Sequence, residues 1–154
     1  MKFETENKII ERIKTFHDAH CELGNEHPFV KSYEKYVNMA SAEEPSVIAF
    51  LELCIICAAL NGGINIEEQY YPWFSLYAKS DYEELADDIK EECHLAVMSY
   101  HIDNKDIGPM YIRVAGSGVS PFIHTKLSLK TKELAEYCGR QFLHIWADYL
   151  FKSI

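Results

Sequence analysis

Apolar residues in the first 60 positions recur every three or four residues, the spacing of one face of an α-helix. This pattern predicts a first helix that ends at Gly24, a second that starts after Pro28 and a third over residues 45–60. Nearly every face of the third predicted helix is apolar, and Glu52 is its one charged residue. A helix of this kind is buried on all sides, so we expect it at the centre of the core.

The pattern changes after residue 63 to short runs of aromatic and β-branched residues, which are typical of strands. Turn-like stretches at 103–105 and at Gly116–Gly118 lie between some of these runs, which predicts a small antiparallel sheet. Between the first two runs lies an acidic segment, 81–92, whose apolar positions have helical spacing, so we expect a short surface helix there. The four predicted strands are Tyr70–Tyr77, Leu95–Ile102, Met110–Ala115 and Phe122–Leu129.

The last predicted element is a long helix that begins after Thr131. Thr131 is a good N-cap residue, and Glu133 and Glu136 follow in the first turns, where the helix dipole favours anions. An apolar stripe along this helix predicts that it packs across the sheet. Together the elements predict an α+β fold in a single domain, 1–154, with a helical sub-region at 1–63 and a sheet plus closing helix at 64–154.

The segment LSLKTKELAEYCGRQFLHIWADYL, with YYPWF at 70–74, resembles a C-terminal module of small uncharacterised proteins of phages, prophages and other mobile elements of gut bacteria. The family's helix reads KTxELAEYxGKQF, and this chain differs in having Arg140 where the family usually has Lys. The resemblance implies an α+β module of mobile-element origin and brings no known reaction. We interpret the shared residues as structural, with Gly139 allowing a close approach of helix to sheet.

The net charge of the chain limits the kinds of molecule that it is expected to bind. The chain of 154 residues has 24 acidic residues against 15 Lys and Arg, a formal net charge of -9. Such a surface repels a phosphate backbone, which argues against generic nucleic-acid binding and favours a basic partner. The N-terminus has no apolar run long enough for a signal peptide, and the most apolar stretch, Val47–Leu60, is too short to cross a membrane. The cysteines are odd in number, so we expect a cytoplasmic protein without membrane contact.

The acidic segment is the first candidate site. Its carboxylates would dock on a basic protein surface, and the alternative is an ordinary solvated helix face. The residues predicted to bind a partner are Asp81, Glu83, Glu84, Asp87, Asp88, Glu91 and Glu92.

A second candidate site lies in the one locally basic part of the chain, residues 105–140. Backbone N–H groups of a loop at Gly116–Gly118 would hold a phosphate, and an aromatic side chain would stack on a base. The alternative is a plain hairpin turn, because no complete phosphate-loop motif is present. The predicted ligand-binding residues are Trp73, Tyr111, Arg113, Ser117, His124 and Lys126.

Cysteine and histidine pairs leave metal or redox chemistry open without favouring it. Cys54 and Cys57 have the spacing of a redox pair or half of a zinc site, yet they lie in the apolar third helix. His17, His20 and Cys21 share neighbouring faces of the first helix, and Cys93 adjoins His94. We expect no catalytic residue, no metal and no cofactor.

The leading hypothesis is therefore a non-catalytic cytoplasmic binding protein of phage or mobile-element origin that occupies a host or defence protein through its acidic surface. The alternative is a protein that sequesters a nucleotide or another phosphate-bearing small molecule, and an enzyme that uses Cys and His residues ranks third. Exposed strand edges permit a homodimer without requiring one.

Overall fold

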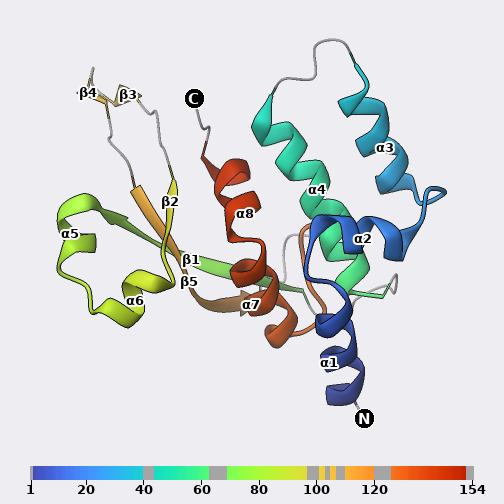
Figure 1. Ribbon diagram of the computed structural model, residues 1–154, viewed down its shortest axis with the longest axis horizontal. Coiled ribbons are helices and arrows are strands. Elements are labelled where there is room, and N and C mark those ends of the chain that lie inside the picture. The colour runs from blue at the N-terminus through green and yellow to red at the C-terminus, as the bar shows by residue number, and fades with distance from the viewer. Residues whose placement is uncertain are drawn as a thin grey trace.

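The computed structural model describes residues 2–39, 44–62, 69–96, 101–102, 105–106, 110–119 and 126–151. The described elements form three layers, and Figure 1 shows the antiparallel sheet on one side, the two C-terminal helices in the middle and the N-terminal helices on the far side. This arrangement confirms the predicted α+β fold. None of the helices in these ranges is long and apolar enough to span a membrane.

The first predicted helix is two helices, α1 (Lys2–Arg12) and α2 (Phe16–Leu23). The break is a capping box: the Thr15 hydroxyl accepts a hydrogen bond from the Asp18 N–H at 3.1 Å, and the Asp18 carboxylate accepts one from the Thr15 N–H at 2.9 Å. This reciprocal pair starts a new helix, so the prediction of one continuous helix is wrong. The predicted end at Gly24 is confirmed, and its φ of 79° is a conformation that glycine adopts without strain.

The next two helices agree with the sequence pattern. They are α3 (Pro28–Val37) and α4 (Pro45–Leu60), and each has a proline in its first turn. Most of α4 is buried from Leu53 onward, and α4 packs against α2, α3 and the C-terminal helix α8 (Leu143–Leu150). The predicted central helix is therefore confirmed.

The main sheet contains β1 (Tyr70–Ala78), β5 (Met110–Val119) and β2 (His94–Ala96), in the order β1-β5-β2 with both pairs antiparallel. A separate pair is formed by β3 (His101–Ile102) and β4 (Lys105–Asp106). Of the predicted strand at 95–102, residues 95–96 belong to β2, residues 101–102 belong to the second pair, and residues 97–100 lie outside the described part. Of the predicted strand at 122–129, residues 122–125 lie outside the described part, and Leu129 forms a single bridge with Tyr70.

Strand β5 is longer than predicted and includes the Gly116–Gly118 stretch. Its residues pair with β1, with Ser117 opposite Pro72 and Gly116 opposite Trp73. Because Val114 lies opposite Phe74, Ala115 is one extra residue, a β-bulge. The prediction of a turn here is wrong, since the bulge, with Gly116 at a φ of +153°, lets the strand continue along β1.

The acidic segment forms two helices rather than one, α5 (Lys79–Glu83) and α6 (Asp87–Glu91), separated by extended backbone at Ala86. A continuous helix would place like charges four residues apart, such as Glu84 above Asp88, which is destabilising.

The predicted closing helix is also split, into α7 (Lys132–Gln141) and α8 (Leu143–Leu150), at the buried Phe142. The split lets α7 lie on β1 and β5 while α8 packs between β2 and α4. Thr131 is the N-cap as predicted, and its hydroxyl accepts a hydrogen bond from the Leu134 N–H at 3.2 Å. The expected role of Gly139 is confirmed, since a Cβ there would lie 2.7 Å from the Cβ of Pro72.

Candidate functional site

Residues 79–92, which we call the acidic lobe, form a strongly negative projection beyond the sheet (Figure 1). All seven predicted carboxylates are exposed: Asp81, Glu83, Glu84, Asp87, Asp88, Glu91 and Glu92. The exposure that their sequence pattern predicted is therefore confirmed, and their predicted role in binding a partner stays a prediction.

Two of these carboxylates have a cationic partner. Glu92 accepts a hydrogen bond from the Arg113 guanidinium at 2.6 Å, and Glu83 lies 4.0 Å from the Lys79 ammonium group. The other five form no ion pair with any described residue. They leave a surface whose negative charge the rest of the described chain does not neutralise.

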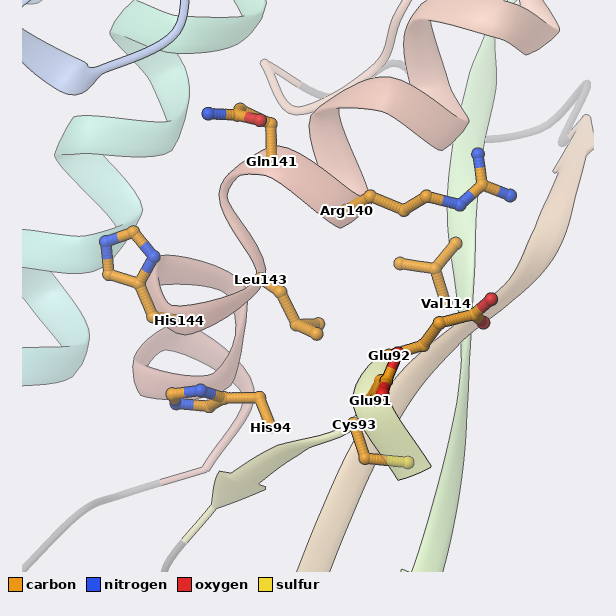
Figure 2. Close-up of a pocket in the computed structure, with 9 residues that line it drawn as sticks. All are labelled: Glu91, Glu92, Cys93, His94, Val114, Arg140, Gln141, Leu143 and His144. Atoms are coloured by element: carbon orange, nitrogen blue, oxygen red, sulfur yellow. The ribbon is translucent and has the colours of Figure 1, made fainter. Parts of the chain in front are cut away.

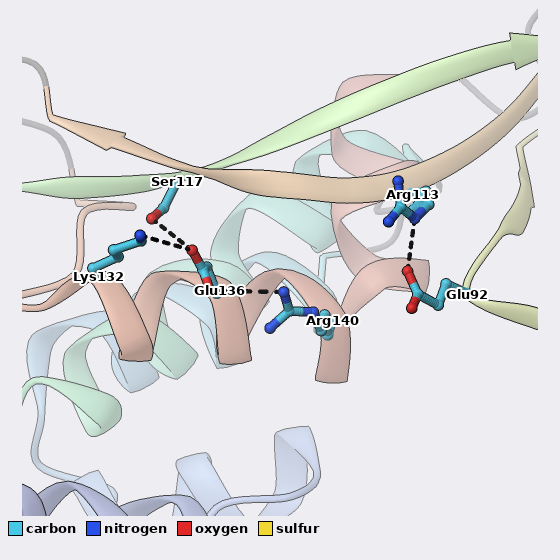
Figure 3. Close-up of polar contacts among 6 residues, drawn as sticks. All are labelled: Glu92, Arg113, Ser117, Lys132, Glu136 and Arg140. Atoms are coloured by element: carbon cyan, nitrogen blue, oxygen red, sulfur yellow. Dashed lines mark hydrogen bonds and ion pairs between the residues drawn. The ribbon is translucent and has the colours of Figure 1, made fainter. Parts of the chain in front are cut away.

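The acidic lobe is fixed to the sheet at two points. Tyr82 stacks on Tyr111 of β5, with ring centroids 3.7 Å apart and planes 7° from parallel, and the Lys90 ammonium lies 5.7 Å from the centre of the Tyr82 ring. The second point is the ion pair between Glu92 and Arg113 (Figure 3). The backbone of the acidic lobe is therefore fixed against the sheet at two points, while five of its carboxylates extend into solvent.

A pocket of about 360 Å³ lies where α6 and β2 face the junction of α7 and α8 (Figure 2). Its apolar floor contains the buried residues Val114 and Leu143, and its rim carries polar groups of both signs. An apolar floor with a few convergent polar groups is the usual composition of a small-molecule site. The polar lining residues are Glu91, Glu92, Cys93, His94, Arg140, Gln141 and His144.

The pocket is not equipped for thiol catalysis. The Cys93 thiol donates a hydrogen bond to the Ile89 carbonyl at 3.3 Å, and burial is the main cause that raises its pKa above the ordinary value. A nucleophilic cysteine needs the opposite shift. The hypothesis of a Cys and His enzyme therefore gains no support at this pair.

The residues predicted to bind a phosphate are not brought together. Ser117 donates a hydrogen bond to Glu136 at 3.1 Å, inside a cluster in which Lys132 and Arg140 also approach Glu136 (Figure 3). Arg113 is engaged by Glu92.

The remaining predicted ligands differ in their surroundings, and the Trp73 ring lies against Gly118, the residue after Ser117. Tyr111 is covered on one face by Tyr82, and the Lys126 ammonium lies 5.2 Å from the centre of the Phe29 ring. Trp73 is exposed on β1, and His124 lies outside the described residues. Because Gly116–Gly118 belongs to a strand paired with β1, these residues do not form the expected loop, and the predicted role of the site in binding a nucleotide stays a prediction.

The cysteines of the C-x-x-C motif are buried in α4. Burial raises the pKa of Cys54 to about 11, and burial together with the neighbouring Cys138 thiol raises that of Cys57. In α2, His20 lies 3.3 Å from Glu34, and the His17 ring is 3.5 Å from the Cys21 sulfur. Among the described residues, no three His, Cys, Asp or Glu side chains are placed to hold a metal ion together.

The pocket and the anchoring role of Tyr82 were not predicted from the sequence. The pocket combines residues 91–94, 114 and 140–144, which no local spacing connects. The anchoring role of Tyr82 was accessible in part, since an aromatic residue within an acidic segment indicates packing rather than solvation.

Comparison of the chain with family models, with curated proteins and with solved structures finds no match.

Proposed function

We propose that this protein is a non-catalytic binding protein that occupies a partner with a basic surface through the acidic lobe. The observation that carries the proposal is the set of five exposed carboxylates that no described cation neutralises. Charges of one sign gathered on a surface steer an oppositely charged partner and reject like-charged ones. The anchoring of Tyr82 on Tyr111 supports the proposal, because a fixed surface binds at lower cost than a mobile one.

We propose a cytoplasmic host or defence protein as the partner class. The resemblance of the C-terminal segment to mobile-element proteins supports this choice, because such proteins act on components of the cell that carries them. The net charge of -9 supports a protein rather than a nucleic acid as the partner.

The test compares two triple charge reversals. The lobe variant combines Asp87→Lys, Asp88→Lys and Glu91→Lys, and the control variant combines Glu11→Lys, Glu133→Lys and Asp148→Lys, all at exposed positions. Both variants change the net charge equally, so a general effect of charge would affect them alike. Circular dichroism of each variant checks the fold.

Each protein is used as bait in a host extract, and a protein captured by the wild type is purified and titrated directly. We expect the control variant to bind it as the wild type does, the lobe variant to lose binding, and the wild-type affinity to fall with salt. Equal affinity of the lobe variant for the purified partner would refute the proposal.

A second candidate function is binding of a small molecule in the pocket between α6 and α8, which the polar rim around Val114 and Leu143 favours. Arg140, which also lies 3.6 Å from Glu136, supplies donors for a carboxylate or phosphate group, whereas the Gln141 amide already donates to the Lys14 carbonyl at 2.8 Å. Glu91, which forms no ion pair with a described residue, supplies an acceptor for an amine. The probes are free amino acids and short phosphorylated metabolites in a thermal-shift assay. A stabilising probe whose effect disappears in Arg140→Ala supports this function, and no shift across the panel counts against it.

A further inference from the structure

Strand β1 lies at an edge of the sheet, and its outer side has backbone groups that point away from β5. The N–H and C=O of Tyr70 both bond to Leu129, each at 2.9 Å, on the side opposite β5. Backbone groups alternate along a strand, so those of Pro72, Phe74 and Leu76 point to the same outer side. Beyond Leu129, no described strand pairs with this side of β1.

This edge has two of the usual protections of an edge strand, Pro72 and the bulge opposite Trp73 and Phe74, but it lacks charged residues. None of the nine residues of β1 is charged, and Trp73 and Leu76 keep 60% and 43% of their surface exposed. Monomeric proteins usually guard such an edge with charged residues, because a bare edge pairs with another strand. Pro72 removes one outward N–H, and the outward groups of Phe74 and Leu76 stay available.

An apolar groove of about 420 Å³ follows the same edge. It continues from β1 onto the end of α8, where Leu150 is exposed and Phe151 buried. A strand laid along this groove would gain backbone hydrogen bonds and apolar contacts together. The groove is lined by Pro72, Trp73, Phe74, Leu76, Leu150 and Phe151.

We propose that the occupant of this edge is β1 of a second copy of the chain, in an antiparallel and twofold-symmetric dimer. With the axis at Ser75, Phe74 of each copy lies opposite Leu76 of the other, and the outward groups of both residues bond reciprocally. The same register places the exposed Trp73 beside Tyr77 of the second copy, an aromatic cross-strand pair. The pairing joins the two main sheets into one.

Charge complementarity selects a second copy over an unrelated strand. In this register Ala78 lies opposite Pro72 of the other copy, so the helix α5 that follows reaches the level of Tyr70 and its neighbour Leu129. Residues 126–132 around Leu129 contain three lysines and no acid, although Lys132 lies 3.9 Å from Glu136. Helix α5 and the next residue carry three acids against one lysine: Asp81, Glu83 and Glu84 against Lys79, which pairs with Glu83. Each acidic α5 thus meets the basic segment of the other copy, twice per dimer.

The first experiment measures the mass of the protein by sedimentation equilibrium over micromolar concentrations. Leu76→Lys places a charge on the free edge, and Leu95→Lys on β2 is the matched control, since Leu95 is 49% exposed. We expect a dimer for the wild type and for Leu95→Lys, and a monomer for Leu76→Lys. A wild type that stays monomeric overturns the proposal and would leave the edge to a strand of another protein. A Leu76→Lys variant that dimerises as tightly as the wild type also overturns it.

The second experiment tests the register by exchanging charges. One variant combines Asp81→Lys with Glu84→Lys, and the other combines Lys126→Glu with Lys130→Glu. Each variant alone is expected to dimerise more weakly, because like charges then meet, and an equimolar mixture is expected to form a heterodimer. A mixture that associates no better than its components overturns the antiparallel register.

The dimer does not depend on the proposed function. It uses β1 together with Asp81 and Glu84, so of the five carboxylates of the proposed function it leaves Asp87, Asp88 and Glu91 for the partner, and the partner-binding test changes these three. Loss of either result leaves the other standing.

Discussion

Gly139 of α7 lies directly against Pro72 of β1, and no other residue type fits between this helix and the sheet without displacement. A Cβ on Gly139 would lie 2.7 Å from the Cβ of Pro72 and 3.0 Å from Cγ2 of Val114. Both neighbours are stiff, buried side chains, the ring of Pro72 and the β-branched Val114, so moving either of them costs free energy.

Gly139→Ala is therefore expected to lower the free energy of unfolding by about 1 to 3 kcal/mol, the usual cost of overpacking. Replacing glycine by alanine inside a helix would by itself stabilise the protein by about 1 kcal/mol. A measured loss of stability would therefore show that the steric cost of the added Cβ is larger than this gain. Urea denaturation followed by circular dichroism measures the change in stability. In a Pro72→Gly background the same change should cost less, and a stabilised Gly139→Ala protein would contradict the contact.

The carboxylate of Asp18 predicts how stability changes in acid. Hydrogen bonds from the Lys14 N–H at 3.0 Å and from the N–H and hydroxyl of Thr15 hold the pKa of Asp18 below its ordinary value. Because the folded-state pKa is the lower one, the stabilisation is complete above the unfolded pKa of about 3.9 and is lost as the pH falls through the folded value.

Asp18→Asn removes this titration, so its free energy of unfolding should fall less steeply than that of the wild type below about pH 4. Urea denaturation at several pH values measures the difference. Asp87→Asn is the control, because the Asp87 carboxylate has no hydrogen bond in the described part of the chain, and it should keep the wild-type slope. Identical slopes for all three proteins would argue against the role of Asp18.

Thiol labelling distinguishes a buried core from a redox centre. Cys21 is exposed, whereas Cys54, Cys57 and Cys138 are buried, and the pKa of Cys54 is raised to about 11. We expect a disulfide reagent at pH 8 to modify Cys21 first in the native protein and the three buried thiols only on unfolding. Peptide mapping by mass spectrometry identifies the order. Fast native labelling of Cys54 or Cys57 would revive the redox interpretation.

The stacked pair Tyr82 and Tyr111 should control the order of the acidic lobe. Tyr82→Ala is expected to speed hydrogen exchange at residues 79–92 while leaving α4 protected. A double-mutant cycle with Tyr111→Ala should give a coupling of about 0.5 to 1.5 kcal/mol, the range for aromatic pairs. Tyr82→Phe keeps the ring and should behave as the wild type. Unchanged exchange in Tyr82→Ala would show that other contacts fix the lobe.

The fold was predictable where local signals and burial agree. Pro45 and the apolar run to Leu60 defined α4 because a buried helix needs both a start signal and apolar surroundings. The break before α2 was also readable, since Thr15 and Asp18 have capping-box spacing, but the longer apolar stripe across it suggested one helix. The break at Phe142 has no comparable signal, because it depends on how α8 packs between β2 and α4.

The candidate site was predictable only where it is local. The composition of the acidic segment is sufficient to predict that its side chains are exposed. Gly116–Gly118 has the residues of a turn, yet pairing with β1 decides its conformation, and that pairing joins positions more than 40 residues apart. The phosphate-site prediction relied on a loop at that position, so it loses this support and stays a prediction.

The middle position of α7 and α8 has a consequence for synthesis. Residues 132–150 are the layer on which both the sheet and α4 bury their inner faces, and a ribosome makes them after everything that they join. Until then the growing chain carries an apolar helix and an uncharged strand without their partners. The nascent protein therefore depends on its own speed of completion, or on a chaperone, to avoid aggregation before its core can close.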